Sequence, residues 1–302
     1  MTEKPIIAGI GELLWDVLPS GKELGGAPCN FAYHAIQAGC EGFVVSAIGK
    51  DELGAELKHE IRELGLSNQY IQENEFPTST VTVKLDDKGH PDYTIHKNVA
   101  WDHIRWNKDM QQLARKLDAV CFGSLAQRSP ESEHSVKSFI SALKPGCLKV
   151  FDINLRQKFY SEKVIINSLN ISDVLKLNEE ELLIVAGFLG FKGDIERQID
   201  QLINQFKLKY VVYTMGSNGS IIKSTEESSY TEAPKIQVAD TVGAGDAFTA
   251  IFIAGILKGI SLTETHNEAT EIAAYVCTQK GATPKLTQNI FQQQIYKTYE
   301  KF

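Results

Sequence analysis

The stretch Asp240-Thr-Val-Gly-Ala-Gly-Asp246-Ala-Phe-Thr-Ala250 decides how this 302-residue chain arranges its chemistry. It joins a strand-like segment to an apolar helix through small residues. Gly243, Ala244 and Gly245 leave backbone N–H groups unobstructed where the helix begins. A helix N-terminus carries unpaired donors and partial positive charge, so it suits an anion. Asp246 stands beside this site as a proton acceptor, and the segment therefore offers both parts of a phosphoryl-transfer site.

This segment also has a simpler structural interpretation. A glycine-rich turn between a strand and a helix, capped by Asp246, fits the same residues. A short glycine motif alone does not distinguish such a turn from an anion site. Residues 247–257 are apolar nearly all round, which predicts a buried helix. A buried helix whose N-terminus opens into a cleft provides a desolvated anion site.

Composition places the chain among ordinary globular proteins. Apolar residues make up 43% and charged residues 23% of a length that suits one large α/β domain or two ordinary ones. The net charge of −7, with no basic run, argues against a surface that coats nucleic acid. The N-terminus lacks the pattern of a signal peptide, and no apolar stretch reaches the roughly 18 residues of a membrane span. We expect a cytoplasmic protein that binds neither membranes nor nucleic acid.

Cysteine and histidine usage agrees with this expectation. The five cysteines are odd in number and form no C-x-x-C pair, which predicts reduced and mostly buried thiols. The seven histidines form no H-E-x-x-H or H-x-H pair, so we expect no structural transition-metal site.

Apolar, β-rich runs alternate with helix-like stretches along nearly the whole chain. Strands are predicted at residues 6–10, 43–48, 119–122, 149–152, 174–177 and 210–214. Helices are predicted at residues 28–38, 52–64, 108–117, 131–143, 179–186, 195–206 and 247–257. Strands this apolar are buried on both faces, which indicates a mainly parallel sheet between two helix layers. The predicted fold is a three-layer α/β/α sandwich in a single domain, residues 1–302.

One segment breaks this alternation. Residues 80–85, Thr-Val-Thr-Val-Lys-Leu, alternate with period two, Asp87-Lys-Gly-His90 supplies a turn, and residues 93–96 continue as a second strand. The pattern predicts a β-hairpin with one polar face, beside which residues 13–18 can pair. We expect the inserted segments at about 12–25 and 77–104 to form a small β-sheet lid over the carboxyl ends of the main strands.

Two further segments place polar groups beside glycine or at a strand end. Gly25-Gly-Ala-Pro-Cys-Asn30 lets a ligand approach the backbone, and its Asn30 amide suits sugar hydroxyls. Taken alone, a turn with a helix cap is the simpler explanation. Asp152-Ile-Asn-Leu-Arg156 ends a buried strand, and period two places its polar residues on one side. The carboxyl end of a parallel strand is where α/β proteins bind ligands.

Two later segments also follow predicted strands. Asn178-Glu-Glu-Glu181 suits Mg²⁺ held through water, and the alternative is a solvated first helical turn favoured by the helix dipole. Thr214-Met-Gly-Ser-Asn-Gly219 is a turn between two strands, which by itself indicates only a hairpin.

Together these segments resemble the ribokinase-like, or PfkB, carbohydrate kinases over essentially the full chain. Gly25–Asn30 and the later Ala47-Ile-Gly-Lys-Asp-Glu-Leu-Gly54 resemble the first signature of that family. Asp240–Ala250 resembles its second signature, which is long and specific. Three shorter motifs lie between them in the family's order, namely Asp152-x-Asn-x-Arg156, Asn178-x-x-Glu181 and Thr214-x-Gly216. The resemblance implies a ribokinase-like fold and an ATP-dependent kinase.

The resemblance implies a role for each residue of the second signature. Asp246 would take the proton from a sugar hydroxyl. Gly243, Ala244 and Gly245 would form the anion hole for the transferred phosphoryl group. Asp240 and the Val242 carbonyl match part of a monovalent-cation site that many members have, with K⁺ as the expected ion. Gly281 is a further candidate for that site.

The other motifs would hold the nucleotide and the sugar. By the same resemblance, Asn178 and Glu181 would organise Mg²⁺ and the phosphates through water, and Thr214 and Gly216 would line the nucleotide site. The residues expected at the sugar hydroxyls are Asp16, Gly26 and Asn30, with Arg156 contacting substrate or phosphate. A lid that closes over the sugar would keep water from competing for the γ-phosphate.

Two stretches resemble bacterial fructokinases in particular, Gly11-Glu-Leu-Leu-Trp-Asp-Val-Leu-Pro19 and Gly123-Ser-Leu-Ala-Gln-Arg128. This resemblance implies D-fructose as the substrate, phosphorylated on its 6-hydroxyl. A kinase for ribose, a keto-sugar acid or a nucleoside is an open alternative. So is a non-catalytic sugar-binding regulator, although the intact Asp246 and anion hole count against it. Exposed strand edges on the lid favour a homodimer through that surface.

Overall fold

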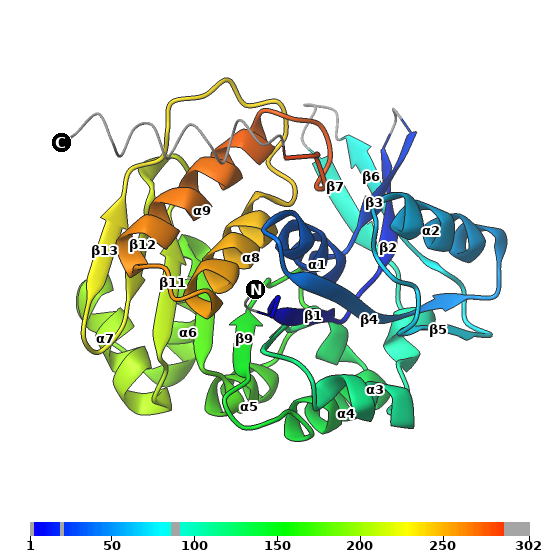
Figure 1. The fold of residues 1–302 in the computed structure, drawn as a ribbon, viewed down its shortest axis with the longest axis horizontal. Coiled ribbons are helices and arrows are strands. Elements are labelled where there is room, and N and C mark those ends of the chain that lie inside the picture. The colour runs from blue at the N-terminus through cyan, green and yellow to red at the C-terminus, as the bar shows by residue number, and fades with distance from the viewer. Residues whose placement is uncertain (1–2, 19–20, 86–90, 287–302) are drawn as a thin grey trace.

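A nine-stranded sheet runs through the molecule with helices on both of its faces (Figure 1). The computed structural model describes residues 3–18, 21–85 and 91–286. The strands of the large sheet lie in the order β13 (Ser228–Thr231), β12 (Ser220–Lys223), β11 (Tyr210–Thr214), β10 (Val174–Asn178), β9 (Leu148–Asp152), β8 (Ala119–Phe122), β1 (Ile6–Ile10), β4 (Glu41–Gly49) and β5 (Ile71–Asn74). From β11 to β5 all neighbours are parallel, whereas β12 and β13 are antiparallel.

Two helix layers bury the two faces of this sheet. One face is covered by α1 (Ala27–Gln37), α8 (Ala244–Leu257) and α9 (Leu262–Cys277). The other is covered by α3 (Lys108–Ala114), α4 (Pro130–Ser141), α5 (Glu162–Ile171), α6 (Glu179–Leu189) and α7 (Ile195–Phe206). Along β1, Ile7 packs with the first layer and Ala8 with the second. This alternation explains why each central strand is apolar throughout.

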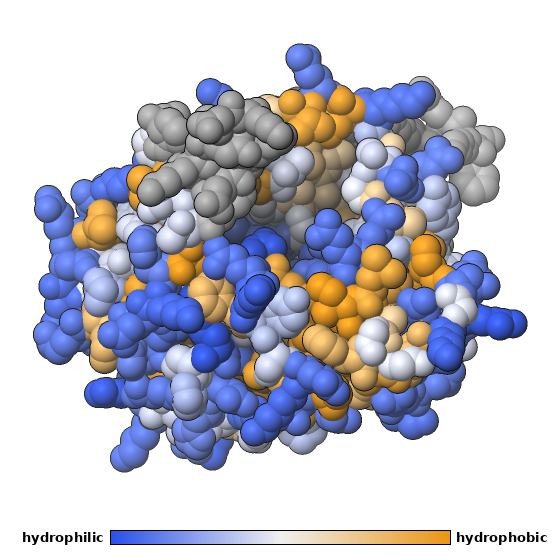
Figure 2. Space-filling view, turned by 180° about the vertical axis from the view of Figure 1, so that it is seen from behind, coloured by the Kyte–Doolittle hydropathy of each residue, from blue (hydrophilic) through white to orange (hydrophobic). Residues whose placement is uncertain are grey.

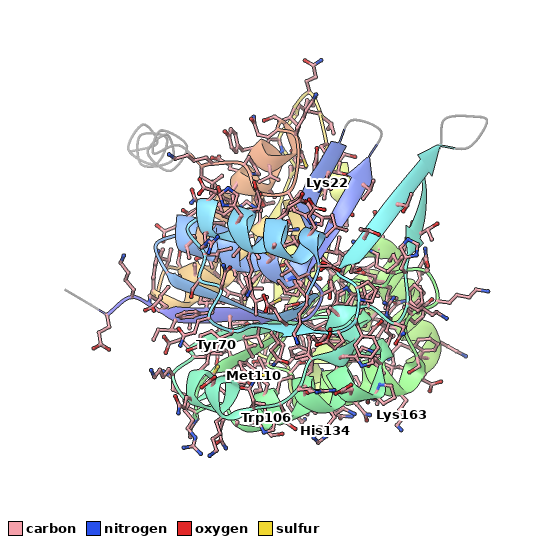
Figure 3. The ribbon with its side chains drawn as sticks, turned by 90° about the vertical axis from the view of Figure 1, so that its right-hand side faces the viewer. Lys22, Tyr70, Trp106, Met110, His134 and Lys163 are labelled. Carbon is pink, nitrogen blue, oxygen red and sulfur yellow. The ribbon has the colours of Figure 1, made fainter. Side chains whose placement is uncertain are left out.

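A second sheet of four strands stands beside the large one, and we call it the lid sheet. Its order is β3 (Gly21–Gly25), β2 (Leu14–Leu18), β6 (Ser79–Leu85) and β7 (Pro91–Ile95). The predicted hairpin is confirmed, because β6 and β7 pair antiparallel, and β2 joins β6 in parallel. The predicted turn Asp87–His90 lies outside the described residues. In Figure 3 the lid sheet projects from the body, with Lys22 on it, while Trp106 and His134 lie in the far helix layer.

The start of β6 is tied to the carboxyl end of β4 by a compact set of hydrogen bonds. Asp51, the N-cap of α2 (Glu52–Glu63), accepts from Gly54 N (2.8 Å), Thr78 N (2.8 Å) and the Thr78 hydroxyl (2.6 Å). Gly49 N in turn donates to Thr78 Oγ1 (2.9 Å). One buried threonine therefore joins the lid sheet to the main sheet.

The predicted elements are confirmed with small changes at their ends. All six predicted strands and all seven predicted helices are present, displaced by at most three residues. The sequence patterns did not predict β3, β5, β13, α5 and α9. The cysteines are free, as expected, and four of the five are buried. The single α/β/α sandwich with a mainly parallel sheet is the observed architecture.

Within the described ranges, no helix is both long and apolar enough to cross a membrane. On the face seen from behind, hydrophobic residues gather in patches among hydrophilic ones (Figure 2).

Candidate active site

The first turn of α8 is shaped by glycine. Gly243, its N-cap, has φ 77°, in the left-handed region that favours glycine. A Cβ at Gly243 would lie 2.6 Å from both the Cβ and the carbonyl oxygen of Ala282, so a larger residue does not fit. No side chain caps this N-terminus; Ala244 N donates to the Thr241 carbonyl (3.4 Å), and the N–H groups of Gly245 and Asp246 are left for another acceptor.

The first turn of α1 is built in the same way. Its N-cap is Gly26, with φ 117°, and a Cβ there would lie 2.5 Å from the carbonyl oxygen of Glu12. The glycine N-cap has no side chain, but the N–H groups of this turn are already used: Ala27 N donates to the Glu12 carboxylate, Pro28 has no N–H, and Cys29 N donates to the Gly26 carbonyl (3.0 Å). The other seven α-helices in the described part of the chain all have side-chain caps, from Asp51, Asn107, Ser129, Ser161, Asn178, Asp194 and Ser261. The two glycine signatures therefore produce the two α-helices with glycine N-caps, and of these α8 keeps N–H groups for a ligand.

A hydrogen bond joins these two helices at their first turns. Asn30 Nδ2, on α1, donates to Asp246 Oδ2, on α8, over 2.8 Å. Asn30 is buried, and its Oδ1 has no hydrogen-bond partner among the described residues. The unpaired oxygen is suited to a hydroxyl donor from a ligand, because buried polar atoms normally have a partner.

The surroundings of Asp246 make its carboxylate a better base than a free aspartate. Burial raises the pKa of Asp246 to about 7, and the nearby negative charge of Asp152 adds to this effect. The Asn30 hydrogen bond and the charges of Lys176 and Arg156 act in the opposite direction. A proton acceptor with a pKa near neutrality is suited to general-base chemistry.

A buried ion pair lies behind the first turn of α8. Lys176 Nζ, from β10, is 3.1 Å from Asp152 Oδ1, at the end of β9. Asp152 Oδ2 lies 3.2 Å from the Thr249 hydroxyl, which is also 2.9 Å from the carbonyl oxygen of Gly245. Burial penalises the Lys176 charge, but Asp152, Glu181 and Asp246 outweigh it and raise the lysine pKa.

The prediction that Asp152, Asn154 and Arg156 share one side was wrong. β9 ends at Asp152, and Asn154 has φ 44°, so the two-residue alternation stops there. Asp152 is buried, whereas Arg156 is exposed and its Nη1 donates to the Leu155 carbonyl (3.2 Å). The charge of Arg156 still reaches the site, because it lowers the pKa of Glu12, Asp16 and Asp246.

The expected sugar-binding residues lie where the lid sheet meets α1. Asp16 on β2 pairs across the sheet with Glu23 on β3. Burial, with the like charge of Glu23, raises the pKa of Asp16 to about 6. A Cβ at Gly25 would lie 2.3 Å from Asp16 Oδ2, so glycine leaves room for this carboxylate. Gly26 alone then separates β3 from α1.

The Asn178 and Glu181 side chains hold the first turn of α6. Asn178 Oδ1 accepts from Glu181 N, and Glu181 Oε2 accepts from Asn178 N, both over 2.9 Å. Glu181 Oε1 also accepts from Leu155 N (2.9 Å). No group of three or more His, Cys, Asp or Glu side chains in the described ranges is arranged to hold a metal.

The remaining predicted residues lie in two loops. Thr214 ends β11, and Gly216, with φ 53°, begins an exposed turn that leads into β12. Asp240 is hydrogen-bonded to the other two candidate cation residues: its Oδ1 accepts from Val242 N (3.0 Å) and its Oδ2 from Gly281 N (3.3 Å). The three residues assigned to the cation site therefore come together.

Two charged residues near the site were missed by the sequence analysis. Lys176 interrupts an apolar strand, and a charge within a buried strand is a signal that a partner exists. Glu12 follows β1, is buried, and its Oε2 has no hydrogen-bond partner among the described residues. Burial raises the pKa of Glu12.

A separate cavity of about 620 Å³ lies beside the N-termini of α4 and α5. Its walls include Lys97, Arg128, Lys158 and Lys163, and none of the residues predicted for the active site. Arg128 is held there by a buried ion pair with Asp102 (2.7 Å).

The pfkB family carbohydrate kinase domain matches residues 19–289. The chain therefore belongs to the pfkB family of carbohydrate kinases, and it is a phosphotransferase. The match covers both glycine signatures and the two helices that follow them.

Individual relatives differ in the sugar that they phosphorylate. The chain is 26% identical to a fructokinase from Salmonella typhimurium, over 91% of this chain and 92% of the relative. It is also 26% identical to an ATP-dependent 6-phosphofructokinase from Thermoanaerobacterium thermosaccharolyticum, over 90% of this chain and 88% of the relative. Family membership alone does not select the sugar.

A solved structure confirms the fold. A fructokinase from Xylella fastidiosa with bound ATP superposes with a TM-score of 0.85, covering 96% of this chain and 99% of that one. At 20% sequence identity this similarity concerns the fold, which is ribokinase-like.

Proposed function

We propose that this chain transfers the γ-phosphoryl group of ATP to the 6-hydroxyl of D-fructose, giving fructose 6-phosphate and ADP. The observation that carries the proposal is the Asn30–Asp246 hydrogen bond, which holds a carboxylate in the uncapped first turn of α8. Fixed N–H groups stabilise transferred negative charge, and the carboxylate accepts the proton of the attacking hydroxyl.

In the proposed reaction, the sugar hydroxyl attacks the γ-phosphorus while its proton passes to Asp246. The new O–P bond forms as the bond to the β-phosphate oxygen breaks, and ADP leaves with that electron pair. The N-terminus of α8, at Gly243, Ala244 and Gly245, faces the transferred group. Positioning and charge stabilisation account for the rate, since a sugar hydroxyl is a poor nucleophile.

Mg²⁺ would neutralise charge on the ATP phosphates, with Asn178 and Glu181 organising its water ligands. The donor set fits this indirect role, because both Glu181 oxygens already accept backbone N–H bonds. Thr214 and Gly216 line the proposed nucleotide site. We assign the loop of Asp240, Val242 and Gly281 to a monovalent cation, in keeping with the carboxylate that gathers its backbone.

The sugar would lie between the lid sheet and α1. Asp16, Gly26 and Asn30 are the proposed hydroxyl contacts, and Arg156 is the proposed contact for substrate or phosphate. The unpartnered Asn30 Oδ1 supports a donor hydroxyl at that position. The fructokinase relative supports fructose, and the 6-phosphofructokinase relative makes fructose 6-phosphate the main competitor.

A substrate panel tests this proposal. Purified protein is supplied with ATP and Mg²⁺ and with fructose, fructose 6-phosphate, ribose, a keto-sugar acid or a nucleoside, and ADP release is measured. We expect the highest kcat/KM with fructose. A higher kcat/KM with another acceptor would mean that the chain is a kinase for that acceptor and not for fructose. Sugar binding without ADP release for any acceptor would point to a regulator.

A further inference from the structure

We propose that the buried Lys176–Asp152 pair is a positioning element that holds the first turn of α8 and sets the ionisation of Asp246. This proposal rests on the proposed role of Asp246 as the base. Neither Lys176 nor Asp152 is expected to touch the sugar or the transferred group.

The geometry places the pair directly beneath the anion hole. Lys176 Nζ lies 3.0 Å from the point that a Cβ on Gly245 would occupy, so the lysine packs against the residue before Asp246. The Lys176 side chain is 11% exposed and that of Asp152 5%, so both charges are removed from solvent. A charge in this position acts through a medium that screens it weakly.

The pair is also bonded to the helix itself. The Thr249 hydroxyl, one turn after Asp246, is within hydrogen-bonding distance of both Asp152 Oδ2 (3.2 Å) and the Gly245 carbonyl oxygen (2.9 Å). Its single proton is shared between these two acceptors. Asp152 therefore connects the end of β9 with the helix turn that carries the base.

The opposite charges of the pair act on Asp246 in opposite directions. Asp152 raises the pKa of Asp246, and Lys176 lowers it to a smaller extent. The other groups that face this carboxylate are Asn30 and Arg156, which lower its pKa, and the buried thiols Cys29 and Cys121, whose own pKa values it raises. Since both thiols stay neutral near pH 7 and Arg156 is exposed, the Lys176–Asp152 pair is the buried charged element that substitution can remove.

The experiment is a set of kcat/KM profiles against pH for wild type, Asp152→Asn and Asp152→Asn/Lys176→Met, with ATP, Mg²⁺ and the best sugar of the panel. Asp152→Asn removes the anion and leaves the cation, so the midpoint of the acid limb moves down by about one pH unit or more. Adding Lys176→Met moves the midpoint back up. The double variant still lies below wild type, because the effect of Asp152 is the larger one.

The double variant keeps the test decisive if Asp152→Asn does not fold, because it leaves no uncompensated charge at this position. The matched control is Asp102→Asn, which breaks the buried pair with Arg128 (2.7 Å), and neither of these charges is among the causes that shift the pKa of Asp246. Asp102→Asn can lower the stability of the protein, but the acid limb of its kcat/KM profile is expected at the same pH as in wild type. Acid limbs that coincide in wild type, single and double variants would overturn the proposal.

A readout without turnover separates this inference from the proposed function. The ¹³C carboxyl shift of Asp246, assigned with Asp246→Asn, is titrated by NMR in the same variants. If wild type phosphorylates no sugar, the proposed function fails, and the titration still decides the inference. A carboxyl that titrates at the same pH in all three proteins would contradict it.

Discussion

Asp246 gains its chemical character from three neighbours on three different elements. Asn30 on α1 fixes its orientation through a 2.8 Å hydrogen bond, while Asp152 on β9 and Lys176 on β10 set its charge from behind. The side chain is partly buried, which raises its pKa to about 7. In the proposed reaction this carboxylate accepts a proton late in phosphoryl transfer, and with this pKa about half of it is ionised at pH 7.

Asp246→Asn is expected to lower kcat by roughly 10²- to 10⁴-fold, because an amide cannot accept the proton. The dissociation constant for sugar should change little, since the Asn30 contact can be retained. Steady-state kinetics and calorimetric sugar titration measure the two quantities. Retention of most of the wild-type kcat would show that another group takes the proton.

The same substitution is expected to stabilise the protein at alkaline pH. The folded-state pKa of Asp246, about 7, lies above the unfolded value of 3.8, so the folded state carries the cost of an ionised, partly buried group above pH 7. That cost disappears as pH falls toward 4. An asparagine side chain does not ionise and has no such cost. The free energy of unfolding of the variant should therefore exceed that of wild type by on the order of 2 kcal/mol at pH 8, after solvent screening is allowed for.

Thermal unfolding of wild type and Asp246→Asn at pH 4, 6 and 8 measures this effect. The difference in Tm should grow from pH 4 to pH 8. An equal difference at all three pH values would mean that the ionisation of Asp246 does not contribute.

At the scale of elements, α1 and α8 differ from the other described α-helices in having glycine N-caps. In α1, Glu12 and Gly26 accept from the first N–H groups, whereas the first turn of α8 has no side-chain cap. A side-chain cap stabilises a helix by about 1 kcal/mol, so the uncapped N-terminus of α8 is a local cost. It lies at the Asn30–Asp246 hydrogen bond, where the proposed function gives its N–H groups a ligand.

Gly243→Ala is expected to impair both stability and turnover. Ala at φ 77° costs about 1–2 kcal/mol, and its Cβ would meet Ala282 at 2.6 Å. The first turn of α8 must shift, which would distort the proposed anion hole, so kcat should fall. The matched control is Gly187→Ala within α6, where nothing lies within 4 Å of the new Cβ.

The control should be more stable by about 0.5–1 kcal/mol, with unchanged kinetics, because Ala is the better helix former. Chemical denaturation and steady-state kinetics on both variants give the comparison. A Gly243→Ala enzyme with wild-type kcat would contradict the assigned anion hole.

The elements with strong periodicity were the ones that the sequence could predict. The apolar central strands and the helix at 247–257 are present because burial on both sides leaves a clear pattern. Short edge strands such as β5 and β13 carry no such pattern, since they are defined by a neighbour distant in sequence.

The candidate site shows the same limit. The residues of the glycine motifs could be predicted, because a left-handed N-cap requires glycine. The separation of the Arg156 and Asp152 side chains could not be predicted from the sequence, because it depends on where β9 ends. The partner of Lys176 is equally hidden, since Asp152 reaches it only through the pairing of β9 with β10.

At the scale of the whole molecule, the lid sheet is attached through Thr78. Its hydroxyl donates to Asp51 (2.6 Å) and accepts from Gly49 N (2.9 Å), at the carboxyl end of β4. Thr78 is buried, so the loss of its hydroxyl cannot easily be replaced by water. The position of the lid sheet over the main sheet therefore depends on this contact.

Thr78→Val is expected to destabilise the fold by about 1–3 kcal/mol, because a buried donor and a buried acceptor lose their partner. The KM for sugar should rise more than the KM for ATP, because the lid sheet carries Asp16. Thr78→Ser keeps the hydroxyl and is the control, with kinetics close to wild type. Equal increases in both KM values would indicate a general loss of structure instead.

The single residue between β3 and α1 couples the two halves of the proposed site. When the lid sheet shifts, Gly26 passes the shift to the first turn of α1, and Asn30 passes it to Asp246. We therefore expect the arrival of the sugar to complete the alignment of the base. Such coupling would favour transfer to the sugar over transfer to water, since the sugar and the base are connected through Gly26 and Asn30.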